Sequence, residues 1–134
     1  MNEECNSLVK EIAKLYMEYS DEKFSGWSKA FYRIRALPSQ FGGNGSYING
    51  DEVELIGVFD HEELLEPLHK LFKELWQALE SIEKEFIVCL LVVDSEYNFN
   101  IYFDYEDPEK WSISKLDGGI GIPVGYEQLI EKSI

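Results

Sequence analysis

Cysteine, basic residues and long hydrophobic runs are all scarce in this sequence of 134 residues, and each shortage excludes a class of protein. The two cysteines, Cys5 and Cys89, are too few for a disulfide framework, and Cys89 lies within the apolar run FIVCLLVV. We therefore expect buried, reduced thiols in a cytoplasmic protein. No apolar stretch approaches the ~20 residues needed to cross a bilayer. The N-terminus, MNEECNSLVK, also lacks the basic and apolar regions of a secretory signal.

Basic residues number 12 against 26 acidic ones, which gives a formal net charge of −14. The excess is concentrated, because residues 51–107 hold 16 acidic residues and only three lysines. We expect no nucleic acid partner, since binding a polyanion requires a basic surface, and an anionic membrane is disfavoured for the same reason. Such a charge is typical of a soluble surface, and it also accelerates encounter with a basic protein.

The remaining composition is that of a folded protein, with 45% hydrophobic and 14% aromatic residues in a chain long enough for one domain. Apolar residues spaced three and four apart predict a helix over residues 2–19. Alternating residues predict a strand over residues 27–37, closed by Pro38 and the run FGGNGS. A second strand is expected within residues 47–60, where Asn49-Gly50 is a possible turn.

A long helix follows, with Asp60 as its expected N-cap, Glu63 at the capping-box spacing and Leu/Trp-rich residues to Ile82. Pro67 predicts either a kink or a later start. Residues 85–107 resemble a β-hairpin turning near residues 94–98, and residues 126–134 form a short helical pattern. The order α-β-β-α-β-β-α predicts a single α+β domain over residues 1–134. We expect an antiparallel sheet of about four strands with helices packed on one face, and the other face open to water or a partner.

No catalytic or metal-binding motif accompanies these elements. A zinc-protease helix needs two histidines four residues apart. Here Leu65 occupies the position four residues after His61, and the second histidine, His69, is eight residues away. The sequence has no G-x-S-x-G elbow, and GGNGSYING lacks the lysine of a phosphate-binding loop. We therefore expect no enzyme activity, no cofactor and no bound metal.

The segment NFNIYFDYEDP contains the most distinctive acidic cluster. Strand alternation places Phe99, Ile101, Phe103 and Tyr105 on a buried face and directs Tyr102, Asp104 and Glu106 outward, with Asp107 following. Asp104 and Glu106 would lie about 6–7 Å apart, which admits a hydrolase with paired carboxylates as an alternative. A magnesium or calcium site at the three acids is a further alternative, although no EF-hand spacing is present. An interface centred on Tyr102 is the remaining interpretation.

At NFNIYFDYEDPEKW the chain resembles the YezG-like immunity proteins, a family of small acidic antitoxins. The order of the preceding helix, strands, acidic Leu/Trp-rich helix and hairpin is also similar, and the resemblance spans roughly residues 5–111. It implies an immunity protein that binds a cognate toxin one to one. Such a toxin is often a nuclease domain delivered by a neighbouring bacterial cell.

The active site of a nuclease is basic because it binds phosphate groups. An acidic surface of complementary charge can therefore bind over it. The predicted toxin-binding residues are those of the hairpin segment and a second acidic group: Tyr102, Asp104, Glu106, Asp107, Asp51, Glu52 and Glu54. A different binding module, an acidic adaptor for basic peptides, is the main alternative to this function.

Overall fold

The computed structural model describes residues 2–132 as one sheet with helices packed against it. Its elements, in chain order, are α1 (Glu3–Lys23), β1 (Trp27–Leu37), β2 (Gln40–Asn49), β3 (Glu52–Leu55), α2 (Glu62–Glu80), β4 (Val88–Asp94), β5 (Phe99–Asp104), the 3-10 turn η1 (Leu116–Gly118) and α3 (Tyr126–Lys132). The helix expected over residues 126–134 is therefore present as α3, and residues 133 and 134 lie outside the described part.

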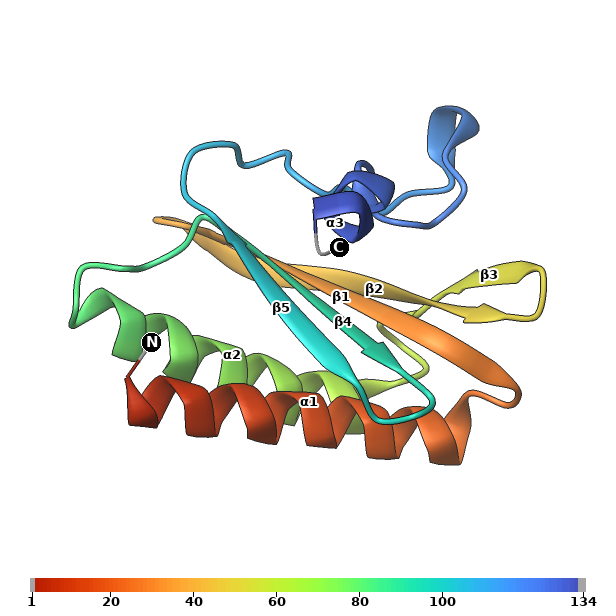
Figure 1. Ribbon diagram of the computed structural model, residues 1–134, viewed down its shortest axis with the longest axis horizontal. Helices are drawn as coiled ribbons and strands as arrows, with labels where there is room; N and C mark the ends of the chain where they lie inside the picture. Colours follow the sequence, from red (N-terminus) through yellow and green to blue (C-terminus); the bar gives the residue numbers. More distant parts are fainter. Residues whose placement is uncertain (1, 133–134) are drawn as a thin grey trace.

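The five strands form one antiparallel sheet in the order β3-β2-β1-β4-β5. This confirms the predicted α+β class, with five strands instead of four. The two long helices, α1 and α2, lie side by side on one face of the sheet (Figure 1). Within residues 2–132 no helix is both long and apolar enough to span a bilayer.

The run FGGNGS was expected to end a strand, and this prediction is wrong because the run lies inside β2. Glycine is required at position 45 because β1 and α1 both approach it closely, and a β-carbon there would lie 2.6 Å from the Phe31 carbonyl oxygen. The Tyr16 hydroxyl donates a hydrogen bond to the Phe31 carbonyl oxygen of β1, 2.7 Å away, directly beside Gly45. A β-carbon on Gly45 would lie only 3.0 Å from that hydroxyl oxygen. Glycine in a strand commonly marks such an approach.

The extra strand is produced by the Asn49-Gly50 turn, which the sequence left as a possibility. Asn49 pairs with Glu52, so Gly50 and Asp51 form a two-residue hairpin connection between β2 and β3. Gly50 has φ 62, which suits the left-handed backbone of such turns. The short β3 is consequently an edge strand of the sheet.

Asp60 is not the N-cap of α2, contrary to the prediction. The helix begins at Glu62 with His61 as N-cap, and no side-chain cap bond forms. The Glu63 carboxylate is used elsewhere, because it accepts a hydrogen bond from the Tyr19 hydroxyl of α1 at 2.9 Å. The same hydroxyl lies 2.7 Å from His61 Nδ1, so α1 fixes the start of α2. Pro67 lies inside the helix.

The second face of the sheet is also covered, so the expectation of an open face is wrong. Residues after β5 cross this face, as Figure 1 shows for the segment leading to α3. They contribute Trp111, Ile113 and Tyr126 to a second hydrophobic cluster that includes Phe31 and Leu90 of the sheet. The sheet is therefore buried between the long helices and this C-terminal segment.

Side chains of β1 and β2 attach the C-terminal segment through its backbone. Arg33 donates to the carbonyl oxygens of Pro108 and Lys110, both at 2.7 Å. The other two attachments are the bonds Asn44 Nδ2 to the Ile113 carbonyl oxygen (2.9 Å) and Ser46 Oγ to the Gly121 carbonyl oxygen (2.6 Å).

Candidate functional site

The acidic residues at the end of β5 are largely occupied in shaping a turn. Asp104 Oδ2 accepts the backbone N–H groups of Glu106 and Asp107 at 3.2 and 2.8 Å. Asp107 Oδ1 accepts the N–H of Glu109 at 2.9 Å. Such local side-chain-to-backbone bonds are the usual role of aspartate in turns. Of the three predicted acids in this group, only Glu106 has a carboxylate free of hydrogen bonds within residues 2–132.

Nearby arginines further reduce the negative character of this group. Arg35 forms an ion pair with Glu109, with Nη1 and Oε1 separated by 3.1 Å. Burial lowers the pKa of Arg33, and Arg35 acts in the same direction, whereas the carboxylates of Glu109 and Asp107 raise it. Part of the acidity of this turn therefore balances two cations of the protein itself.

Tyr102, the predicted aromatic anchor, is only half-buried, but its ring faces the covered side of the sheet. It packs against the second hydrophobic cluster, and its ring centroid lies 6.2 Å from that of Trp111. The alternation predicted for this strand is correct for Phe99, Ile101 and Phe103, which pack against the helix-side core, but wrong for Tyr105, which lies beyond the end of β5 and is 50% exposed. Tyr102 thus contributes to holding the C-terminal segment.

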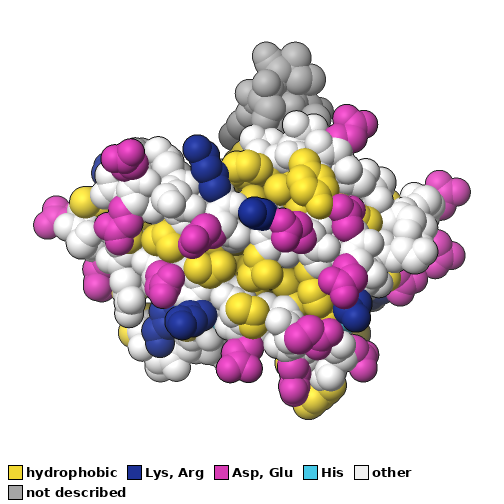
Figure 2. Space-filling view, turned by 90° about the horizontal axis from the view of Figure 1, so that it is seen from below, with side chains coloured by type: hydrophobic (Ala, Val, Ile, Leu, Met, Phe, Trp, Pro, Cys, Tyr) yellow, Lys and Arg dark blue, Asp and Glu magenta, His cyan; other side chains and the backbone are white. Residues whose placement is uncertain are grey.

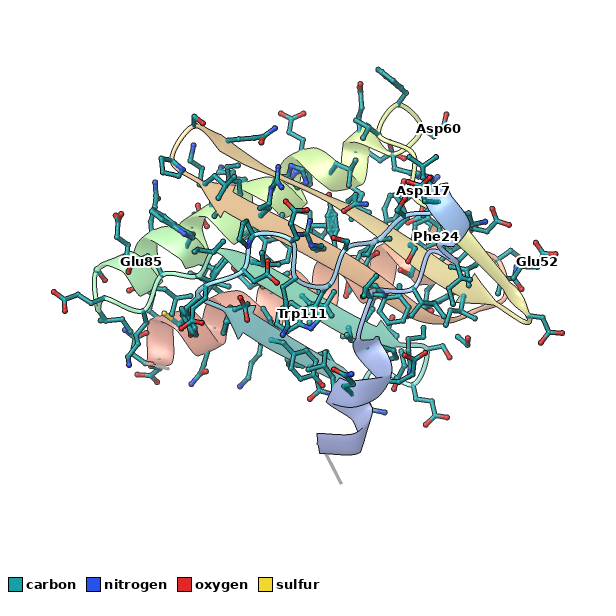
Figure 3. The ribbon with its side chains drawn as sticks, turned by 90° about the horizontal axis from the view of Figure 1, so that it is seen from above. Phe24, Glu52, Asp60, Glu85, Trp111 and Asp117 are labelled. Atoms are coloured by element: carbon teal, nitrogen blue, oxygen red, sulfur yellow. The ribbon has the colours of Figure 1, made fainter. Side chains whose placement is uncertain are left out.

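The second predicted group, Asp51, Glu52 and Glu54, is exposed at the tip and outer edge of the β2–β3 hairpin. Figure 3 shows Glu52 projecting from this tip, at the end of the molecule opposite Glu85. Since β3 and β5 are the two edges of the sheet, the predicted groups are separated by about 19 Å across the strands alone. The structure therefore does not bring the two groups together.

Exposed apolar side chains gather beside the second group. Among the side chains that the structure describes, nine large apolar ones are exposed, of which six lie in residues 55–59 and 116–124, and Phe59 is 91% exposed. These two segments are neighbours, because a β-carbon on Gly121 would lie 2.9 Å from Val53 and 3.6 Å from Leu55. Phe59 was not singled out from the sequence, since residues 47–60 were treated as strand. The adjacent Gly57 indicated a loop.

We name this surface the β3 corner. It consists of the exposed acids and apolar residues Asp51, Glu52, Glu54, Leu55, Val58, Phe59, Asp60, Leu116 and Ile120. Residues 51–66 contain seven acidic residues and no lysine or arginine. Lys115 is the basic residue of the neighbouring segment, and its side chain also approaches Gly121. Large apolar side chains within a polar, charged rim are typical of protein interfaces.

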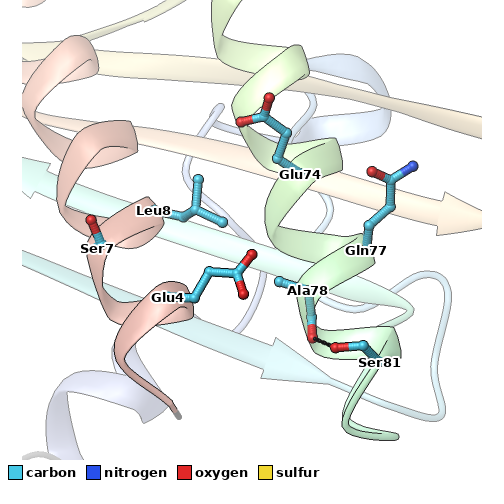
Figure 4. Close-up of a pocket in the computed structure, with 7 residues that line it drawn as sticks. All are labelled: Glu4, Ser7, Leu8, Glu74, Gln77, Ala78 and Ser81. Carbon is cyan, nitrogen blue, oxygen red and sulfur yellow. Dashed lines mark hydrogen bonds between the residues drawn. The ribbon is translucent and has the colours of Figure 1, made fainter.

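A shallow groove of about 530 Å³ runs between α1 and α2 on the outer helix face. Leu8 and Ala78 line its floor, and the carboxylates of Glu4 and Glu74 approach it from the two helices (Figure 4). Figure 2 shows apolar side chains along this face with acidic and basic side chains on both sides. This mixture of signs gives the helix face a weaker charge preference than the β3 corner.

The geometry of the described residues gives little support to a metal site, a cysteine nucleophile or a catalytic carboxylate pair. Within the described residues, no three His, Cys, Asp or Glu side chains are grouped to hold a metal ion. Burial raises the pKa of the Cys5 and Cys89 thiols, which suppresses the nucleophilic thiolate form. Asp104 and Glu106 do not form an enclosed pair, because one carboxylate is bound in the turn and the other side chain is exposed.

Comparison with models of known protein families finds no family that matches this chain, and comparison with curated proteins likewise finds no match.

Proposed function

We propose that this protein is an immunity protein, which neutralises a basic toxin domain, such as a nuclease, by binding it one to one in the cytoplasm. The observation that carries the proposal is the β3 corner. There, Phe59 is 91% exposed and is accompanied by four exposed acidic residues, Asp51, Glu52, Glu54 and Asp60. The resemblance of the hairpin segment to immunity proteins supports the same function.

The two components of the β3 corner have different physical roles. The carboxylates attract a basic partner over a range of about 8–10 Å at physiological salt, which raises the association rate. Phe59, Leu55 and Val58 supply the apolar area whose burial slows dissociation. A partner whose active site binds phosphate would lose access to its substrate when this surface covers it. Inhibition then needs no chemistry from the protein.

The first experiment is affinity capture of the partner from the native cell lysate at 0.1 and 0.5 M salt, followed by mass spectrometry. We expect one stoichiometric protein with a basic domain, retained at both salt concentrations because apolar contacts persist when charges are screened. The captured domain, expressed alone, should arrest growth, and co-expression of this protein should restore it. Heterogeneous, salt-labile basic proteins would instead indicate the adaptor alternative.

Substitutions in this protein, tested in the complex reconstituted with the captured partner, locate the surface that contacts the partner. Phe59→Ala should weaken binding by about 2 kcal/mol, or roughly 30-fold, because exposed aromatics at the centre of interfaces are frequent hot spots. Ile82→Ala is the matched control, since Ile82 is also exposed, at 40%, but lies just beyond the C-terminal end of α2, whereas Phe59 precedes its start. Equal effects of the two substitutions would contradict the placement.

Charge reversals distinguish the two predicted acidic groups. Glu52→Lys should reduce the association rate several-fold at low salt and much less at high salt. Glu106→Lys applies the same charge change to the exposed acid at the end of β5. A loss of binding with Glu106→Lys and not with Glu52→Lys would move the interface to that turn. The paired-carboxylate hydrolase has no comparable supporting observation.

A further inference from the structure

A cavity of about 860 Å³ lies at the end of the sheet opposite the β3 corner. It is bounded by the second half of α2, the turn at residues 38–39 between β1 and β2, and residues 85–87 before β4. Its volume falls within the range of about 300–1,000 Å³ that is common for ligand sites. Neither the predicted acidic groups nor the β3 corner contributes to its lining.

Aromatic side chains form much of the wall: Phe41, Trp76, Phe86 and Tyr105. The Trp76 indole Nε1 donates a hydrogen bond to the Phe86 carbonyl oxygen at 3.0 Å, which fixes the orientation of the ring. Phe86 is itself buried and stacks on Phe103, with ring centroids 5.4 Å apart. Tyr105 is 50% exposed, so the cavity is accessible from solvent on that side.

The charged groups of the cavity favour a cation. Glu80 and Glu85 both line it, and neither forms an ion pair within residues 2–132. Lys73 is the one basic residue among the lining side chains, so the wall carries a net negative charge. The formal charge of −14 on the whole chain adds a field of the same sign. An aromatic wall with nearby carboxylates suits an amphipathic cation, whose apolar part packs on rings while its charge faces oxygen.

We propose that this cavity binds an arginine or lysine side chain presented on an exposed peptide segment. The aliphatic stem packs against Trp76 and Tyr105, and the cationic group lies towards Glu80 and Glu85. The volume of the cavity exceeds that of one side chain and leaves room for the flanking peptide. This inference does not depend on the proposed function, because the cavity is separate from the β3 corner and the test needs no toxin.

The test uses two blocked tripeptides, Ac-Ala-Arg-Ala-NH₂ and its citrulline analogue, which has nearly the same shape without the charge. Each is titrated into the full chain while NMR records the indole N–H signals of the three tryptophans, Trp27, Trp76 and Trp111. We expect the arginine peptide to shift the Trp76 signal saturably while the other two indoles stay unchanged. The citrulline peptide should bind at least about threefold more weakly.

Paired variants complete the test. Glu80→Gln with Glu85→Gln should weaken arginine peptide binding by about three- to fivefold. Glu4→Gln with Glu74→Gln makes the same charge change in the α1–α2 groove and should leave the affinity unchanged. The proposal fails if the Trp76 signal does not respond, if citrulline binds equally well, or if both pairs of variants have the same effect. Failure here would leave the toxin-binding proposal intact, because that proposal is tested at Phe59 and Glu52.

Discussion

Replacing Gly45 by alanine tests whether the close approach of β1 and α1 explains the glycine at this position of the sheet. A β-carbon at this position would lie 2.6 Å from the Phe31 carbonyl oxygen, 3.0 Å from the Tyr16 hydroxyl oxygen and 3.2 Å from Ile56 Cδ1. The first of these atoms belongs to the backbone of the central strand, so a side-chain rotation cannot relieve that contact. The strand or α1 must shift, and the buried Tyr16–Phe31 hydrogen bond is strained or lost.

The expected loss combines two contributions. Overpacking of a core position costs about 1–3 kcal/mol, and weakening the buried hydrogen bond adds about 1 kcal/mol. We therefore expect Gly45→Ala to lower the free energy of unfolding by about 2–4 kcal/mol. Gly42→Ala is the control, because a β-carbon at position 42 of the same strand meets nothing within 4 Å. It should be neutral or stabilising by up to about 1 kcal/mol, through reduced freedom of the unfolded chain.

Urea unfolding followed by tryptophan fluorescence measures both variants. Free energies of unfolding within 0.5 kcal/mol of each other would refute the close-approach explanation. A double-mutant cycle with Tyr16→Phe adds a second check. Removal of the hydroxyl should reduce the cost of Gly45→Ala by about 1 kcal/mol, since both groups occupy the same space.

Two further predictions concern stability. Burial lowers the pKa of His69 from its ordinary value of 6.5, and its ring accepts or donates a hydrogen bond with the Tyr32 hydroxyl. The unfolded chain therefore binds the proton first as the pH falls, so His69 contributes stability at pH 8 that is lost as the pH falls from 6.5 through its lowered pKa in the folded chain. The destabilisation caused by His69→Gln, measured by urea unfolding, should accordingly shrink between pH 8 and pH 5.5, and a constant value would contradict this role. Arg33→Met should cost about 2–3 kcal/mol because two carbonyl oxygens lose a charged donor. Arg35→Met removes the exposed ion pair with Glu109 and the exposed hydrogen bond to Gln40, and should cost less than about 1 kcal/mol.

Much of the fold could be predicted from local patterns. Alternation in WSKAFYRIRAL gave the bounds of β1, residues 27–37, without error, and the turn near residues 94–98 gave the β4–β5 hairpin. The prediction failed at Gly43 and Gly45 because these glycines are required by close contacts with β1, and at Gly45 also with Tyr16 of α1, which no local pattern records. The capping prediction at Asp60 failed for a similar cause, since Tyr19 binds the Glu63 carboxylate that would complete the box.

The sequence does contain an indication that the second face of the sheet is covered. In β4 the residues Val88, Leu90 and Val92 are apolar on the side opposite the helices, and they require a cover of their own. Apolar residues from Trp111 onwards form this cover. Their irregular spacing in the sequence does not indicate where they pack. For the site, the pattern at Asp104–Asp107 was ambiguous, because clustered aspartates serve turns as readily as interfaces.

The attachment of the C-terminal segment has a consequence for how its sequence can vary. Three donors on the sheet, Arg33, Asn44 and Ser46, bind carbonyl oxygens of that segment, a group that every residue type carries. Leu116, Ile120 and Val124 meanwhile face outward with exposed side chains. Substitutions at these three positions would leave the anchoring bonds in place. The fold thus separates the backbone contacts that hold the segment to the sheet from outward side chains that are free to diversify, and two of these, Leu116 and Ile120, belong to the surface through which we propose that partners are recognised.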